Sequence, residues 1–153
     1  MEKKDLDWGN IGFSYMPTDK RYVANYKDGA WDGGAMTSDP NVVINECAGI
    51  LQYCQEIFEG LKAYTTEDGS IVTFRPDLNA ERMMDSARRL EMPPFPKERF
   101  LEAVDQVVKA NAAWVPPFGS GATLYLRPYM FASGPVIGVK LPRSISSGFL
   151  ERL

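Results

Sequence analysis

The residues of this 153-residue sequence whose type and position could do chemistry are few, and two of them are arginines. Arg127 lies between Leu126 and Pro128 in an otherwise apolar segment, where a charge needs a partner or a wet face. Arg82 lies early in a predicted helix, where an exposed helix-forming arginine is the alternative to a site residue. The segment Gly119–Gly121 leads into a predicted strand, so it lacks the helix N-terminus on which phosphate-binding loops depend.

Composition excludes several kinds of chemistry. The sequence has no histidine, which excludes a histidine-dependent triad and removes the commonest metal ligand. Cys47 and Cys54 fit neither a CxxC redox motif nor a zinc knuckle, so we interpret them as reduced thiols. The net charge of -3, with both signs interspersed, gives no basic footprint for nucleic acid. The absence of histidine and the cysteine spacing predict no metal site. The charged start MEKKDLDWGN and the short apolar runs predict a cytoplasmic protein with no membrane partner.

Two hairpins are predicted, each with an Asp-Gly pair at its turn. Asp28-Gly29 lies within RYVANYKDGAWDGGAM (residues 21–36), and Asp68-Gly69 within GLKAYTTEDGSIVTFR (residues 60–75). The pair supplies the positive φ angles that a tight turn between antiparallel strands needs. Between the hairpins, the β-branched run of NVVINECAGILQYCQEIFEG predicts a short strand and then an irregular connection.

Two helices and a last strand follow. Apolar spacing after Pro76 predicts a helix over residues 77–91, and KERFLEAVDQVVKANAAWV predicts a second, amphipathic helix over residues 97–113. TLYLRPYMFAS then predicts a strand, in which Pro128 indicates an edge or a bulge that interrupts the ladder. The order of elements predicts a single α+β domain, an antiparallel sheet built from hairpins and packed with two helices.

Four motifs together resemble a known family. Gln52-Tyr53, IFEGLKAY at 57–64, FRPDLNAERM at 74–83 and LYLRPYMFASGPVIGV at 124–139 are similar in order and spacing to the N-terminal domain of branched-chain amino acid aminotransferases. These enzymes use pyridoxal 5'-phosphate and have fold type IV. The resemblance implies a small N-terminal domain, a larger C-terminal domain, the cofactor between them, and a homodimer. It also implies amino-group transfer from leucine, isoleucine or valine to 2-oxoglutarate.

The resemblance also assigns roles by position. Arg82 matches the arginine that holds the cofactor phosphate, a task that suits the planar fork of a guanidinium. Matches to substrate-site residues are Phe13, Tyr53, Phe58, Tyr125, Arg127 and Val139. Tyr125 and Arg127 form the YxR pair beside the substrate side chain and carboxylate, whereas Tyr53 and Val139 are contributed across the dimer. From composition alone, the default role of the aromatic residues is core packing.

In this family, the lysine that binds the cofactor covalently, the glutamate at the pyridine nitrogen and the amides that complete the phosphate cup lie in the second domain. No lysine of these 153 residues matches the catalytic one. Transamination needs that lysine, both to hold the cofactor ready for exchange and to move the proton. We therefore expect the chain alone to be inactive, with weak or no cofactor binding.

The last segment departs from the family. We expect residues 1–140 to form the domain and residues 141–153, LPRSISSGFLERL, to form a divergent, frayed tail. Codons for LPRSISSGF exist that, read one base earlier from the last A of Lys140, encode TAPKYQFRV, close to the family's continuation. This favours a frameshift, and coding DNA without a continuing second domain in the shifted frame would refute it.

Two other hypotheses remain open. The chain could be a non-catalytic module that dimerises or joins a full-length relative, because the face that should meet the missing parts would expose apolar and aromatic residues and favour self-association. A stable complex with an intact aminotransferase would distinguish it. The chain could also derive from a related fold-type IV enzyme, a D-amino acid aminotransferase or an aminodeoxychorismate lyase, although the FEGLKAY, NAERM and YLRP strings favour the branched-chain pattern.

Overall fold

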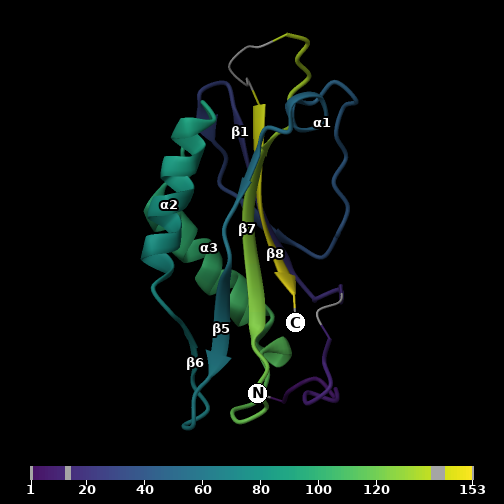
Figure 1. Cartoon of the computed structure of the whole chain (residues 1–153), viewed down its shortest axis with the longest axis vertical. Helices are drawn as coiled ribbons and strands as arrows, with labels where there is room; N and C mark the ends of the chain where they lie inside the picture. Colours follow the sequence, from purple (N-terminus) through teal and green to yellow (C-terminus); the bar gives the residue numbers. More distant parts are fainter. Residues whose placement is uncertain (1, 13–14, 139–143, 153) are drawn as a thin grey trace.

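The computed structural model describes residues 2–12, 15–138 and 144–152, which form an antiparallel sheet with the two long helices on one face (Figure 1). The strand order is β2-β1-β8-β7-β5-β6, with β3 beside β1 and β4 beside β7. The elements are β1 (Arg21–Lys27), β2 (Ala30–Trp31), β3 (Ala35–Thr37), α1 (Gly49–Tyr53), β4 (Glu56–Phe58), β5 (Leu61–Thr65), β6 (Ile71–Thr73), α2 (Pro76–Arg89), α3 (Lys97–Ala110), the 3-10 helix η1 (Ala112–Trp114), β7 (Leu124–Ala132) and β8 (Ser144–Arg152). The predicted α+β class is confirmed.

Both hairpins form, but their turns differ. Asp28 and Gly29 have φ angles of 53° and 90° and join β1 directly to β2, as predicted. The second turn is longer, because β5 ends at Thr65 and β6 begins at Ile71. Gly69 has a φ of 83°, whereas Asp68 is not among the residues with positive φ and instead accepts a hydrogen bond from the Ser70 amide. The tight two-residue turn predicted there is wrong.

The short strand predicted in the β-branched run after Asn41 is also wrong. Residues 41–45 form a loop, and Val43 is 97% exposed. A β-branched run becomes a strand only where a sheet edge is available to pair with it, and this run has none beside it. The chain instead forms the five-residue helix α1 and then β4, which pairs with β7.

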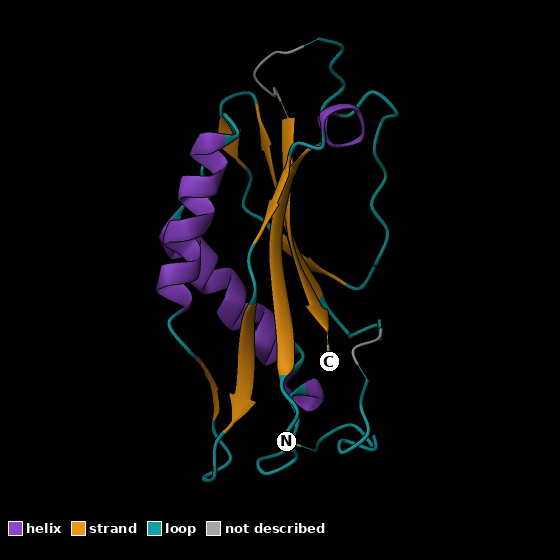
Figure 2. Ribbon diagram, viewed as in Figure 1, coloured by secondary structure: helices purple, strands orange, loops and turns teal. Residues whose placement is uncertain are grey.

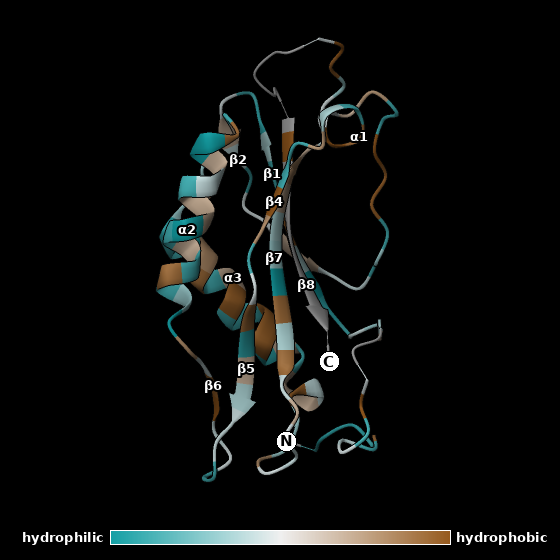
Figure 3. Cartoon of the chain, viewed as in Figure 1, coloured by the Kyte–Doolittle hydropathy of each residue, from teal (hydrophilic) through white to brown (hydrophobic). Residues whose placement is uncertain are grey.

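The two helices agree with the prediction. Pro76 takes the first position of α2, where its missing N–H costs nothing, and α3 begins directly after Pro96. Figure 2 shows both helices on one side of the sheet. Their buried residues, Ala80, Met83, Ala87, Phe100, Val104 and Val107, share one core with Leu124, Leu126 and Met130 of β7. In Figure 3 the alternation of apolar and polar residues shows as bands along β7. Leu124 and Leu126 are buried in the core, whereas Tyr125 and Arg127 alternate with them and are half-buried, so these two residues face away from the helices.

Asn111 fastens the end of α3 to the start of β1. Its side chain is fully buried; it accepts the Lys20 amide at 3.0 Å and donates to the Lys20 carbonyl at 2.8 Å and the Val107 carbonyl at 2.9 Å. Asn111→Ala removes the side-chain partner of the Lys20 amide and carbonyl, whereas the Val107 carbonyl keeps its bond from the backbone amide of residue 111. We therefore expect about 3 kcal/mol less stability by urea unfolding. The control Asn10→Ala, at an exposed site bonded to Asp7, should change it by under about 0.5 kcal/mol. Equal effects would contradict the fastening role.

Pro128 is not at an edge. β7 pairs with β8 on one side and with β4 and β5 on the other. The predicted interruption of the ladder does exist, since β4 pairing stops at Tyr129 and β5 pairing resumes at Leu126. The Glu59 amide donates to the Pro128 carbonyl at 2.8 Å, but proline has no N–H to return the bond.

Residues 144–152 of the tail, which was expected to fray, instead form a central strand. β8 lies between β1 and β7, pairing Ser146 with both Asn25 and Phe131, and Ile145 is fully buried. Unpaired strand edges on both sides explain this, because any extended segment that reaches them satisfies their backbone groups. Among the described residues, no helix has the length and apolar character needed to span a membrane.

Candidate functional site

A cavity of about 330 Å³ lies where β5, the junction of β6 with α2, and β7 meet. Arg82 and Tyr125, two of the predicted site residues, both line it. Gly60 makes room for the tyrosine, because a Cβ there would lie 2.6 Å from the Tyr125 hydroxyl. Lys62 and Arg75 also line this cavity, which makes its wall cationic.

Arg82 is held by a carboxylate that sequence reasoning missed. Its Nε and Nη2 donate to the two carboxylate oxygens of Glu59 at 3.1 and 2.7 Å. Asn79 adds a bond of 2.8 Å to the same carboxylate. The hydrogen bonds to Glu59 raise the pKa of Arg82 above its ordinary value. Because the Arg82 side chain is 57% exposed, the pair adds little to stability, but it fixes the guanidinium.

Arg75 is similarly paired. Its Nε and Nη2 donate to the carboxylate of Asp77 at 2.9 and 2.7 Å, which lowers the pKa of Asp77 to about 2. Arg75 has a φ of 46° and precedes the first residue of α2. Both arginines of the cavity therefore carry a partner carboxylate in this structure.

Arg127 lies over two aromatic rings on the face of β7 away from the helices. Its guanidinium carbon is 4.6 Å from the centroid of Phe58 and 5.6 Å from that of Tyr125. Its Nε is buried and has no hydrogen-bond partner among the described residues. A buried donor without a partner is costly, so a bond to an acceptor such as a carboxylate would be favourable there. The structure thus brings Phe58, Tyr125 and Arg127 together.

The remaining predicted residues lie elsewhere. Tyr53, at the end of α1, is exposed, does not line the cavity of Arg82, and accepts a hydrogen bond from the Gly138 amide at 2.7 Å. Phe13 and Val139 lie outside the described residues.

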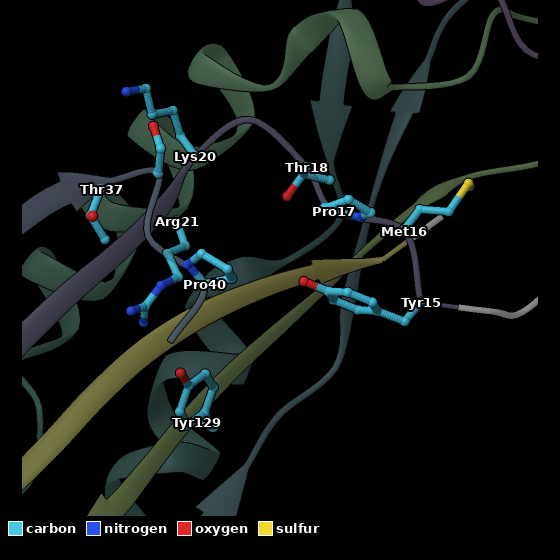
Figure 4. Close-up of a pocket in the computed structure, with 10 residues that line it drawn as sticks. Tyr15, Met16, Pro17, Thr18, Lys20, Arg21, Thr37, Pro40 and Tyr129 are labelled. Carbon is cyan, nitrogen blue, oxygen red and sulfur yellow. The ribbon is translucent and has the colours of Figure 1, made fainter. Parts of the chain in front are cut away.

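A smaller cavity, of about 80 Å³, lies near the start of β1 (Figure 4). Arg21 and Tyr129 line it, and burial raises the pKa of Tyr129. The Arg21 guanidinium donates to the carbonyls of Asp39 and Asn41 at 2.5 and 2.8 Å. These bonds tie the following loop to the sheet, so we interpret Arg21 as a structural residue.

The fold is that of the small domain of an aminotransferase. The structure of the branched-chain aminotransferase of Escherichia coli matches with a TM-score of 0.68 and 21% identity, over 88% of this chain and 39% of that one. The structure of the Thermoproteus uzoniensis branched-chain aminotransferase with norvaline matches with a TM-score of 0.64 and 24% identity, over 88% and 40%. At these identities the likeness concerns the fold alone.

Sequence comparison identifies which aminotransferases the chain is related to. The branched-chain-amino-acid aminotransferase of Haemophilus influenzae is 55% identical over 147 residues, which are 95% of this chain and 43% of that protein. That of Helicobacter pylori is 46% identical over 137 residues, 90% and 40% respectively. An Arabidopsis thaliana methionine aminotransferase is 44% identical over 135 residues, 88% and 38%. No protein-family model matches. The chain is thus related to the branched-chain aminotransferases along nearly its whole length and spans about 40% of theirs.

Proposed function

We propose that this chain forms the cofactor-facing small domain of a pyridoxal-phosphate-dependent branched-chain aminotransferase. The observation that carries the proposal is the cavity shared by Arg82 and Tyr125. The Arg127 guanidinium lies over the ring of that tyrosine, and its Nε has no partner within the part of the chain that the structure describes. Sequence relationship supports the same activity, since relatives with that name match 90% or more of the chain.

Arg82 is suited to hold the cofactor phosphate. The Glu59 carboxylate takes its Nε and Nη2, which leaves the Nη1 side of the guanidinium for another anion. A guanidinium gives charge-assisted, directional hydrogen bonds to phosphate oxygens. When bound, pyridoxal phosphate supplies the electron sink on which amino-group transfer depends.

Arg127 and the rings around it are suited to hold the substrate. The buried Nε, unpartnered in residues 2–12, 15–138 and the described part of 144–152, can donate to a substrate carboxylate, and its burial strengthens that bond. The same rings offer apolar surface to the side chain of leucine, isoleucine or valine. We propose that Tyr53, Phe13 and Val139 complete this pocket in a cytoplasmic homodimer.

The proposal divides the activity between this domain and a second one. Residues 1–140 hold phosphate and substrate, residues 141–153 are a divergent segment, and the covalent lysine belongs to the second domain. The 153 residues alone therefore contain residues that bind cofactor and substrate but lack the lysine that transfers the proton during transamination.

The purified 153-residue chain is expected to show no transamination from leucine to 2-oxoglutarate. Titration with pyridoxal phosphate, followed by absorbance and borohydride reduction, should label no single lysine stoichiometrically. The expected result follows from the absence of a lysine at the matching position. One lysine trapped stoichiometrically, together with turnover, would show that a lysine of this domain has been recruited.

A non-catalytic interaction module is the second candidate. It is favoured by large apolar side chains left exposed on the described surface, among them Tyr53, Phe58, Phe74 and Ile137. Its test is sedimentation of the chain with and without the intact Haemophilus influenzae relative. A stable mixed complex supports the module, and independent sedimentation of both proteins argues against it.

A further inference from the structure

Glu59 occupies an inward-facing position that normally belongs to an apolar residue. In an extended segment Glu59 points to the same face as Ile57 and Leu61, which are both buried in the core that includes the helices. The Glu59 side chain is only 12% exposed. A carboxylate in such a position is costly unless hydrogen bonds compensate for its lost hydration. The Glu59 carboxylate therefore requires compensating hydrogen bonds, and its contacts supply them.

Both the backbone amide and the side-chain carboxylate of Glu59 are hydrogen-bonded. Its amide donates to the Pro128 carbonyl at 2.8 Å, in the gap that the proline opens between β4 and β5. Its carboxylate accepts from the almost fully buried Asn79, whose Nδ2 also donates to the Gly60 carbonyl at 3.1 Å. The residue that binds Arg82 is thus itself held in place, its backbone by Pro128 and its carboxylate by Asn79.

We propose that Glu59 is a positioning residue for the phosphate contact of Arg82, with Asn79 holding the carboxylate in place. Gripping Nε and Nη2 fixes the plane of the guanidinium and leaves its Nη1 side for the phosphate. The inference rests on the proposed phosphate role of Arg82 and adds the residue that orients it.

Two effects of Glu59 on phosphate oppose each other. Its negative charge repels the anion, whereas its grip removes the rotamer freedom that an exposed arginine would lose on binding. At an ionic strength of about 0.3 M the screening length falls to about 6 Å, which weakens the repulsion and leaves the orientation unchanged. At this ionic strength, the effect of Glu59 on phosphate affinity therefore comes mainly from its orientation of the Arg82 guanidinium.

The experiment is a titration of the 153-residue chain with inorganic phosphate at this fixed ionic strength, followed by the side-chain 15N signal of Arg82. Arg82→Lys identifies the signal by removing it. Glu59→Gln keeps the shape but loses the two-oxygen acceptor. Glu59→Asp keeps the charge but shortens the reach, and serves if the glutamine variant does not fold. Glu56→Gln, at an exposed carboxylate of β4, is the matched control.

In the parent chain and in Glu56→Gln, phosphate should shift the Arg82 signal saturably. In Glu59→Gln or Glu59→Asp the dissociation constant should rise about fivefold or more, and the Nε signal should move to the position of a free arginine. A dissociation constant within about twofold of the parent, despite that move, would overturn this inference alone. No saturable shift in the parent would overturn the phosphate role of Arg82 as well.

Discussion

Arg82→Met is expected to weaken pyridoxal phosphate binding about 100-fold in a chimera where residues 1–138 of this chain replace the matched segment of the Haemophilus influenzae relative. Two charge-assisted hydrogen bonds to phosphate contribute about 3 kcal/mol together, and each 1.4 kcal/mol is about tenfold in affinity. The substitution also leaves the Glu59 carboxylate without its arginine, in a site only 12% exposed. The measurement is a fluorescence titration of the apo chimera.

Two control variants separate the charge of Arg82 from the geometry of its guanidinium. Arg88→Met removes an arginine of the same helix that pairs with Asp85, and should leave the affinity unchanged. Arg82→Lys keeps the charge but loses the fork, so an intermediate loss is expected. Equal affinities of Arg82→Met and Arg88→Met for the cofactor would refute the role of Arg82.

Ending the chain after Leu141 is expected to abolish cooperative folding. The deletion removes β8, which pairs with β7 from Ala132↔Ile145 to Tyr125↔Arg152 and joins β1 to the rest of the sheet. Two long strand edges would then be left unpaired. Urea unfolding followed by tryptophan fluorescence should show a broad, non-cooperative transition.

Ile145→Ala is the graded control for β8. Its side chain is fully buried, so truncation should cost about 3 kcal/mol while cooperativity survives. A chain ending at Leu141 that unfolds cooperatively, within about 1 kcal/mol of the parent, would contradict the central position of β8.

Local signals predicted the parts of the fold that depend on local physics. The Asp28-Gly29 turn and the start of α2 at Pro76 follow from backbone preferences of a few residues. Val42-Val43 and the tail have local preferences that contradict their final states. Val43 lies in a loop because no edge is beside it, whereas residues 144–152 form a strand because two edges are. Strand order is a property of the whole chain, so a local pattern could not predict it.

The candidate site was predictable in part. Arg127 was marked by its charge within an apolar strand, and no described residue is a hydrogen-bond partner of its Nε. Family resemblance named Arg82 and Tyr125 as site residues with separate roles. It did not predict that they line one cavity, and nothing in their spacing links a helix to a distant strand. Glu59 was missed, although a signal existed. In IFEGLKAY, Glu59 lies two residues from both Ile57 and Leu61 and so shares their buried face. A charged residue on a buried face requires a partner.

Leucine transamination by the chimera of residues 1–138 with the rest of the Haemophilus influenzae relative tests the central claim most directly. The account predicts a folded chimera that binds pyridoxal phosphate and transfers the amino group of leucine, isoleucine or valine to 2-oxoglutarate. The Arg127→Gln chimera should keep the cofactor but lose most of its activity. A chimera that folds and binds the cofactor, yet transfers no amino group from any of the three amino acids, would contradict the claim that this domain carries the substrate site.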